Sequence, residues 1–224
     1  MSGTLTDLVV SEQVDARHWR VVLGRLHATF ATESFTRGLG FVEWLAELAE
    51  QANHHPDVDL RYATVHVSLV SHDAGGLTER DVNLARHISQ LADELKIEAR
   101  PDALQALEIA IDALDIPAVR PFWKAVLAYD DAAPAVAADG TQPALVDPGG
   151  VGPAVWFQQM DAPRPQRNRI HLDVSVPHDV AEQRVAAAIA AGGHLVSDAR
   201  APAWWVLADA EGNEACVCTW QARD

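Results

Sequence analysis

Histidines with acidic residues near them in the sequence are concentrated in the first part of the chain. Seven of the ten histidines lie within the first 87 residues. The adjacent pair His54 and His55 follows Glu50, and His72 lies nine positions before Asp81. Imidazole has an unperturbed pKa near neutrality, so several imidazoles that meet in one pocket can both donate and accept protons at cellular pH. This set predicts acid–base catalysis.

The surrounding patterns predict the elements that position these residues. Apolar residues from Phe35 to Ala49 recur every three or four positions, which predicts a helix that ends near Asn53, because Pro56 disfavours helical backbone just before it. Residues 62–72 alternate as in a half-buried strand, and residues 17–31 also favour a strand. Thr78 and Asp81 form a capping-box pattern that opens a helix running to about residue 95. The histidines are thus predicted at the ends of a helix and a strand.

Each of these residues also has a purely structural interpretation. A histidine at the C-terminus of a helix interacts favourably with the helix dipole, and Asp81 can act as a cap alone. The joint spacing favours the catalytic interpretation. In order along the chain, the pattern consists of Glu50, the His54-His55-Pro56 run, Tyr62, His72, the Gly75-Gly76-Leu77-Thr78 turn and Asp81.

This pattern closely resembles the signature of the pterin-4a-carbinolamine dehydratase family, over roughly residues 8–95. The resemblance implies an antiparallel sheet with helices on one face, and a 4a-hydroxytetrahydropterin substrate that loses water to give a quinonoid dihydropterin. It implies that His54, His55 and His72 line the pterin pocket, with Glu50 and Asp81 at the acidic positions. The reaction serves tetrahydropterin (tetrahydrobiopterin) recycling and requires no cofactor.

The chemistry gives the imidazoles distinct roles. Expulsion of hydroxide is slow unless an acid protonates the leaving oxygen, and a ring nitrogen must lose a proton so that the double bond forms. We hypothesise that His54 and His72 exchange protons with the substrate and that His55 positions and polarises it. Asp81 or Glu50 is expected to fix a tautomer.

The second half of the chain contains an internal repeat. Residues 107–112 precede a predicted helix at 117–127, and residues 170–174 precede one at 179–191; strand-like runs follow at 153–160, 203–208 and 214–220. This βαβββ pattern, written twice, resembles the glyoxalase-like branch of the vicinal oxygen chelate superfamily. The predicted fold class is therefore α+β, with a dehydratase-like domain at residues 1–98 and a glyoxalase-like paired βαβββ domain at residues 104–224.

The resemblance implies a divalent metal bound by the opening and closing strands of the two halves. Glu108 and His171 occupy equivalent positions on the opening strands and are competent ligands. The closing-strand carboxylate would fall near Cys216, whereas Glu214 lies two residues earlier, and residues 156–158 carry no acid or histidine. The sequence predicts an incomplete site and no bound metal.

Tryptophans are frequent in this half. They are expected either to fill its core and cup or to stack on a small aromatic or heterocyclic ligand. The tryptophans concerned are Trp123, Trp156, Trp204, Trp205 and Trp220.

Composition excludes several classes of partner. A formal net charge of −15 repels a phosphate backbone, which argues against nucleic acid. No run approaches the ~20 apolar residues of a membrane span, and the first residues have no leader pattern. A disulfide between Cys216 and Cys218 within a strand would be strained. We expect a cytoplasmic protein that forms a homodimer or a higher homo-oligomer, as both resembled families do.

Two alternatives to the dehydratase stay open. In one, the first domain is a regulatory or dimerisation module that retains the pocket. In the other, the glyoxalase-like domain acts as a metal-dependent lyase or dioxygenase and the first domain is auxiliary.

Overall fold

The chain folds into two compact units, Met1–Ala106 and Leu107–Asp224. The computed structural model describes residues 3–132, 143–163 and 170–222. Each unit encloses a separate hydrophobic core. None of the helices in the described part of the chain combines the length and apolarity that a membrane crossing requires.

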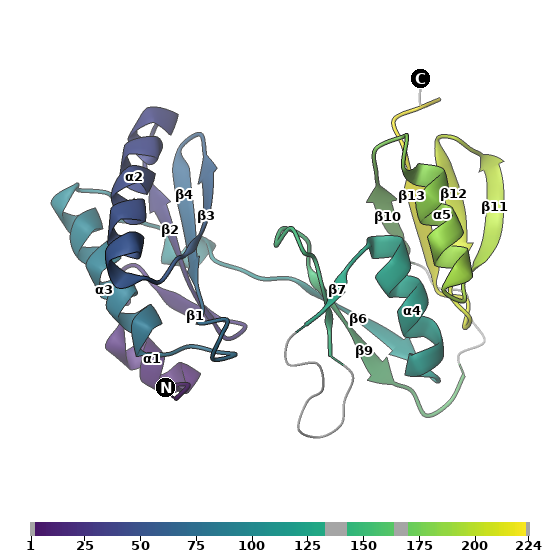
Figure 1. Cartoon of the computed structure of the whole chain (residues 1–224), viewed down its shortest axis with the longest axis horizontal. Helices are drawn as coiled ribbons and strands as arrows, with labels where there is room; N and C mark the ends of the chain where they lie inside the picture. Colours follow the sequence, from purple (N-terminus) through teal and green to yellow (C-terminus); the bar gives the residue numbers. More distant parts are fainter. Residues whose placement is uncertain (1–2, 133–142, 164–169, 223–224) are drawn as a thin grey trace. The chain divides into compact units, whose positions relative to one another are not determined.

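The first unit is an antiparallel sheet with helices on one side (Figure 1). The sheet order is β1-β2-β4-β3, and β5 also pairs with β2. The helices are α1 (Asp7–Gln13), α2 (Phe35–Ala52) and α3 (Glu79–Glu94), and the strands are β1 (Arg20–Val22), β2 (Arg25–Ala31), β3 (Asp57–Arg61), β4 (Thr64–Leu69) and β5 (Glu98–Ala99).

Alternation in β2 explains how the sheet divides polar from apolar side chains. Leu26, Ala28 and Phe30 are buried in the core with the helices, whereas His27 and Thr29 lie on the opposite face. The capping box predicted at the start of α3 is present in full. The fold class predicted for this half is confirmed.

Helix α2 buries the C-terminal part of the predicted stripe but exposes its first residues. Gly38, Phe41 and Leu45 are buried, whereas Phe35 and Leu39 are 51% and 45% exposed. At Gly38 a Cβ atom would lie 2.6 Å from a methyl group of Leu60, so glycine permits close packing of the helix against the sheet.

The first unit extends beyond residue 98, where the predicted first domain ends. Ala99 pairs with Phe30 in the sheet, and the Arg100 amide donates to the Thr29 carbonyl. A short 3₁₀ helix, Pro101–Ala103, follows. These backbone hydrogen bonds tie the segment to β2, so the division between the units falls after Ala106.

The second unit consists of two βαβββ halves with the same topology. The sheet orders are β6-β9-β8-β7 and β10-β13-β12-β11; in each, the first and last strands pair in parallel. The first half contains β6 (Glu108–Ala113), α4 (Ile116–Leu127), β7 (Asp130–Asp131), β8 (Leu145–Val146) and β9 (Ala154–Gln159). The second contains β10 (Leu172–Ser175), α5 (Ala181–Ala190), β11 (His194–Arg200), β12 (Trp204–Ala208) and β13 (Glu214–Cys218).

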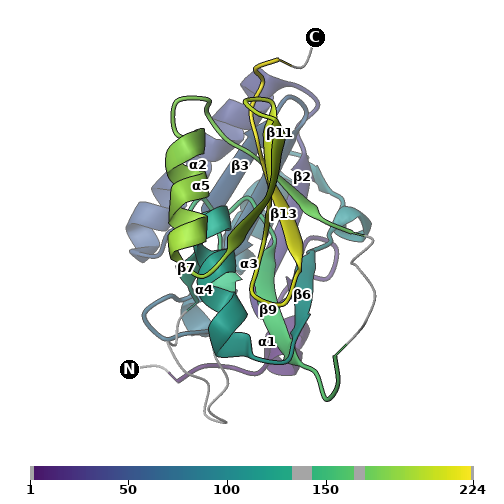
Figure 2. The ribbon, with the colours of Figure 1, turned by 90° about the vertical axis from the view of Figure 1, so that its right-hand side faces the viewer.

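The two halves share one core. Helices α4 and α5 lie side by side in both views (Figures 1 and 2). Phe122 of α4 and Ala188 of α5 belong to the same buried cluster, together with Val155 of β9 and Val217 of β13. The predicted repeat and the paired βαβββ fold are confirmed.

Candidate functional site

A buried histidine–aspartate pair joins the end of α2 to the start of α3. His54 Nε2 lies 2.7 Å from Asp81 Oδ1; the His54 side chain is 7% exposed and Asp81 is fully buried. Left-handed backbone at Asn53 ends α2, and the His54 amide donates back to the Ala49 carbonyl, as in a Schellman motif. The helix stop therefore fixes where the His54 ring enters the core.

Three further donors hold the Asp81 carboxylate. Its Oδ2 accepts hydrogen bonds from Ser71 Oγ at 2.7 Å, the Thr78 amide at 2.8 Å and Thr78 Oγ1 at 3.2 Å. An ionised carboxylate can only accept hydrogen bonds, so a neutral His54 ring must carry its one proton on Nε2, the nitrogen that faces Asp81. The remaining ring nitrogen, Nδ1, is then the proton acceptor. The capping aspartate and the histidine-orienting aspartate are thus the same residue.

The other predicted site residues lie at the surface. His55 Nε2 is 3.1 Å from Glu50 Oε1, and their side chains are 57% and 79% exposed. His72 is exposed and begins a turn that the Gly75 amide closes on its carbonyl. Within the described residues, no hydrogen bond or ion pair joins His72 to His54 or His55. The five predicted residues thus form one buried pair, one exposed pair and an exposed histidine.

Ser71 was not singled out from the sequence. It is 1% exposed, immediately precedes His72, and shares the Asp81 carboxylate with His54. It therefore connects the turn that carries His72, which follows the end of β4, to the buried pair. The sequence feature that could have identified Ser71 is its position immediately before the predicted site residue His72.

A second histidine pair lies on the sheet face opposite the helices. His27 Nδ1 is 3.2 Å from His66 Nε2, the rings stack at 5.3 Å, and Thr29 Oγ1 is 2.9 Å from His66 Nδ1. Burial lowers the pKa of His27 to about 4, helped by the neighbouring His66 and Arg25. Burial also lowers the pKa of His66. Both rings are therefore neutral near pH 7, and the dehydratase motif does not include them.

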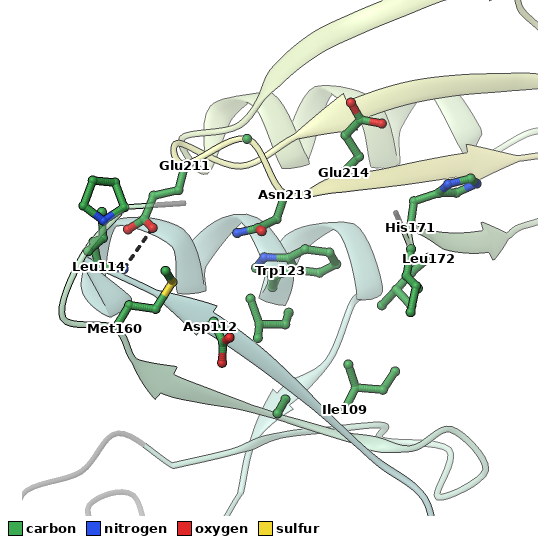
Figure 3. A pocket seen from close by; sticks show the side chains of 15 residues that line it. Ile109, Asp112, Leu114, Trp123, Met160, His171, Leu172, Glu211, Asn213 and Glu214 are labelled. Atoms are coloured by element: carbon green, nitrogen blue, oxygen red, sulfur yellow. Dashed lines mark hydrogen bonds between the residues drawn. The ribbon is translucent and has the colours of Figure 1, made fainter. Parts of the chain in front are cut away.

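The second unit contains a cavity of about 910 Å³ between its two halves. Figure 3 shows the residues around this cavity, with Trp123 of α4 and Asp112 of β6 from the first half, Asn213 and Glu214 from the second half, and His171 to one side. A volume of this size suits a small organic ligand. The lining combines apolar side chains with one indole, one imidazole and carboxylates.

Two acidic side chains near the β12–β13 turn brace this cavity. Asp209 is fully buried and accepts a 2.9 Å hydrogen bond from Trp123 Nε1. Glu211 accepts hydrogen bonds from the amides of Leu114 and Asp115 at 2.9 and 2.6 Å, just before α4 begins. A negative side chain is favourable at that helix end. These contacts connect the two halves and fix the indole.

The predicted metal ligands Glu108 and His171 are not grouped together. Both are exposed, and the cavity lining includes His171 but not Glu108. Among the described residues, the group of potential ligands around His171 consists of His171, Asp173 and Cys216. The metal arrangement that the superfamily implies therefore does not fit this chain.

Cys216 is a buried thiol. Burial, followed by the charge of Asp173 and a hydrogen bond to it, raises the pKa of Cys216 to about 12. Neither cysteine forms a disulfide in the part of the chain that the structure describes.

Of the five tryptophans considered, only Trp123 lines the cavity. Trp156 and Trp220 are 39% and 70% exposed, and Trp204 and Trp205 are half-buried. The Trp220 ring packs edge-on against His178. A stacking ligand in the cavity would therefore meet one indole.

Residues 4–91 match the family model described as pterin 4 alpha carbinolamine dehydratase. A candidate pterin-4-alpha-carbinolamine dehydratase of Nocardia farcinica is 42% identical over 92 residues, which cover 39% of this chain and 97% of that protein. A candidate enzyme of the same name from Roseiflexus is 40% identical over 92 residues, covering 41% and 99%.

Residues 108–218 match the model of a glyoxalase-like domain. A glyoxalase/bleomycin resistance protein/dioxygenase family enzyme from Burkholderia phytofirmans is 21% identical, with a TM-score of 0.40, covering 50% of this chain and 95% of that one. A transcriptional coactivator/pterin dehydratase from Brucella melitensis is 29% identical, with a TM-score of 0.38, covering 40% and 99%.

Proposed function

Because the first unit of the chain belongs to the pterin-4a-carbinolamine dehydratase family and the second is a glyoxalase-like domain, we propose that the protein dehydrates a 4a-hydroxytetrahydropterin. The products are a quinonoid dihydropterin and water. The reaction breaks the C4a–O bond, protonates the departing oxygen and removes one proton from a ring nitrogen. One proton is taken and one is given, so the step consumes no oxidant or reductant.

The observation that carries the proposal is the buried His54–Asp81 pair. With Nε2 donating to the carboxylate, Nδ1 of His54 is the base that removes the proton from the substrate. Ser71 and Thr78 position the carboxylate and do not touch the substrate. General acid–base catalysis of this kind contributes about 10²- to 10⁴-fold to a rate.

We assign the two exposed histidines to the other steps. His72 supplies the proton to the leaving oxygen, and its exposure lets it regain that proton from water. His55, paired with Glu50, binds and polarises the pterin ring. Each assignment predicts a loss of dehydration rate on replacement with little loss of stability, because exposed side chains contribute little to folding.

A spectrophotometric assay of the full chain with a 4a-hydroxytetrahydropterin tests the proposal. We expect the protein to accelerate dehydration above the spontaneous rate, and the double variant His54→Ala/His72→Ala to abolish the acceleration. His87→Gln is a matched control, because His87 is an exposed histidine of the same unit outside the motif. Unchanged dehydration in the folded double variant would refute the assignment. No acceleration by the unmodified chain would favour a regulatory role for the first unit.

The cavity of the second unit favours an additional binding function. Its volume and its fixed indole suit a small aromatic or heterocyclic compound such as a pterin. Titration with a dihydropterin should quench tryptophan fluorescence, and Trp123→Phe should remove most of that response. A response that persists in Trp123→Phe would place the ligand elsewhere.

We also propose that the chain forms a homo-oligomer. Phe35 and Leu39 form an exposed apolar strip on α2, next to the helix face that packs on the sheet. Such strips commonly mark contact surfaces between subunits. Light scattering should give at least twice the chain mass of 24.2 kDa, and Leu39→Glu should reduce it.

A further inference from the structure

The two histidines on the sheet face opposite the helices, His27 and His66, lie outside the dehydratase motif. His27 Nδ1 and His66 Nε2 are 3.2 Å apart. The ring centroids are 5.3 Å apart, close to the largest separation that such a contact allows. The rings therefore meet through these two nitrogens, and each nitrogen of a neutral ring can present a lone pair there.

Strand register holds the pair in place. His27 belongs to β2 and His66 to β4, which are neighbours inside the sheet. Thr29 lies directly opposite His66, and Ser68 lies directly opposite His27. Because side chains alternate along a strand, these four residues share one face, whereas their neighbours in the sequence pack into the core. The two imidazoles are thus diagonal neighbours on adjacent strands.

Thr29 favours the tautomer of His66 that a metal ion requires. Thr29 Oγ1 is 2.9 Å from His66 Nδ1. When the His66 ring carries its proton on Nδ1 and donates it to the hydroxyl, the lone pair of Nε2 is free to face His27. Histidines that bind a metal almost always donate their other N–H to such a partner. The outer partner of one ligand is therefore already in position.

The distance between the two nitrogens suits a tetrahedral ion. With Zn–N bonds of about 2.0–2.1 Å, two nitrogens of a tetrahedral zinc site are about 3.3–3.4 Å apart. The observed separation is 3.2 Å. Small rotations of the two rings would direct both lone pairs at one ion, and the χ2 angle of histidine is broadly distributed.

We propose that His27 Nδ1 and His66 Nε2 bind one Zn²⁺ ion on the sheet face opposite the helices. Imidazole ligands suit zinc, whereas magnesium and calcium prefer oxygen. The other positions around the ion are left for water or an added ligand, as the open position is in catalytic zinc sites. The ion would join β2 to β4. This site goes beyond the proposed dehydration and does not depend on it.

A buried hydroxyl next to the pair supports the site. Ser68 is 6% exposed and lies opposite His27. Its Oγ forms no hydrogen bond with any residue that the structure describes. Buried hydroxyl groups normally have a partner. A water molecule bound to the ion beside His27 would give Ser68 one.

The charged side chains around the pair are engaged with one another. On β3, Asp57 pairs with Arg25 and Asp59 pairs with Arg61. Arg20, on the neighbouring strand β1, directs its guanidinium group to backbone carbonyls just before that strand. The affinity for an ion must therefore come from the two imidazoles, so replacement of either one should have a large effect.

Calorimetric titration of the full chain with zinc tests the proposal. The reference chain carries His171→Gln, which removes one ligand atom from the separate group around His171 in the second unit. We expect this chain to bind a Zn²⁺ ion. His27→Gln and His66→Gln should each weaken that binding by at least about 100-fold, more than the loss of an outer partner costs. His87→Gln, which changes an exposed histidine of the same unit, should leave the affinity unchanged.

Thr29 provides a test that changes neither ligand. Thr29→Val removes the outer partner of His66 and should weaken zinc binding by about 10- to 100-fold. Thr29→Ser keeps the hydroxyl and should keep most of the affinity. A histidine pair with a purely structural role would give no difference between these two variants in zinc binding.

Thermal unfolding with and without zinc gives a second readout. Zinc should raise the Tm of the reference chain, because an ion that binds only the folded chain stabilises it. The rise should disappear in His27→Gln. Each variant is compared with itself, so a variant of lower stability still gives a valid result.

Two results would overturn the assignment. The first is a reference chain that binds no zinc and shows no rise in Tm. The second is zinc binding of unchanged affinity in the folded His27→Gln and His66→Gln variants, because the ion would then be bound by other side chains.

Discussion

Replacement of Asp81 by asparagine should weaken the hydrogen-bond network that holds His54, although it changes only one carboxylate oxygen to an amide nitrogen. The Asp81 carboxylate accepts hydrogen bonds from His54, Ser71 and twice from Thr78. An asparagine has a single acceptor oxygen, and its amide group is a donor that would face another donor. At least one buried donor must therefore lose its partner.

The magnitude follows from these contacts. A buried polar group without a partner costs about 1–3 kcal/mol, and a weakened helix cap costs about 1 kcal/mol. We therefore expect Asp81→Asn to lower the free energy of unfolding by about 2–4 kcal/mol. The dehydration rate should fall by at least about 100-fold, because the amide favours the other tautomer and places the proton on His54 Nδ1.

Urea unfolding and the dehydration assay, run on the same preparation of the full chain, measure both effects. Glu50→Gln is the matched control, because it makes the same change in the exposed His55 pair, which should contribute less than about 1 kcal/mol. A folded Asp81→Asn variant that dehydrates the substrate at the original rate would refute the role of Asp81. Equal stability losses in the two variants would refute the estimate of the buried network.

Three further predictions follow from single contacts. The folded-state pKa of His27 is about 4, below its ordinary value of about 6.5, so the unfolded chain binds more protons than the folded chain between pH 4 and 6.5. The His27 contribution to stability should therefore be complete above about pH 6.5 and decline toward pH 4. Urea unfolding of His27→Gln should show a smaller decline over this range, and an unchanged decline would exclude the buried His27–His66 pair as its cause. Trp123→Phe removes one of several hydrogen bonds to Asp209, which also accepts from Glu211 and Asn213, and should cost about 1–2 kcal/mol by thermal unfolding. An unchanged Tm would show that the indole hydrogen bond adds nothing to stability. His72→Gln should keep the original stability but lose about 100-fold in dehydration rate, and a normal rate would remove His72 from the chemistry.

Local signals in the sequence predicted the ends of elements well. Thr78 and Asp81 form the predicted capping box, and α2 stops at Asn53 as expected before Pro56. These features depend on interactions within a few residues, so spacing alone reveals them. Strand β3 was not predicted, although the run from Asp57 to Arg61 alternates polar and apolar residues, because it is only five residues long and lies at the sheet edge.

The parts that the sequence did not reveal depend on tertiary packing. The stripe from Phe35 to Ala49 correctly predicted a helix and the burial of its C-terminal part, whereas Phe35 and Leu39 are exposed. Close packing of the helix against the sheet at Gly38 is a tertiary contact that the stripe alone does not reveal. The network around Asp81 needs Ser71, which a different segment supplies.

The candidate metal ligands show the same limit. The repeat placed His171 opposite Glu108 in the two halves, whereas the structure groups His171 with Asp173 and Cys216, which meet through the parallel register of β10 and β13. The 38 residues from 176 to 213 separate these strands in the sequence. Glu108, equivalent by repeat, lies on a sheet of the other half.

The rate of dehydration of a 4a-hydroxytetrahydropterin by the full chain, compared directly with His54→Ala, tests the central claim. A buried imidazole held by Asp81 should accelerate the reaction, and its removal should return the rate to within a few per cent of the spontaneous one. Equal acceleration by the unmodified protein and a folded His54→Ala variant would contradict it.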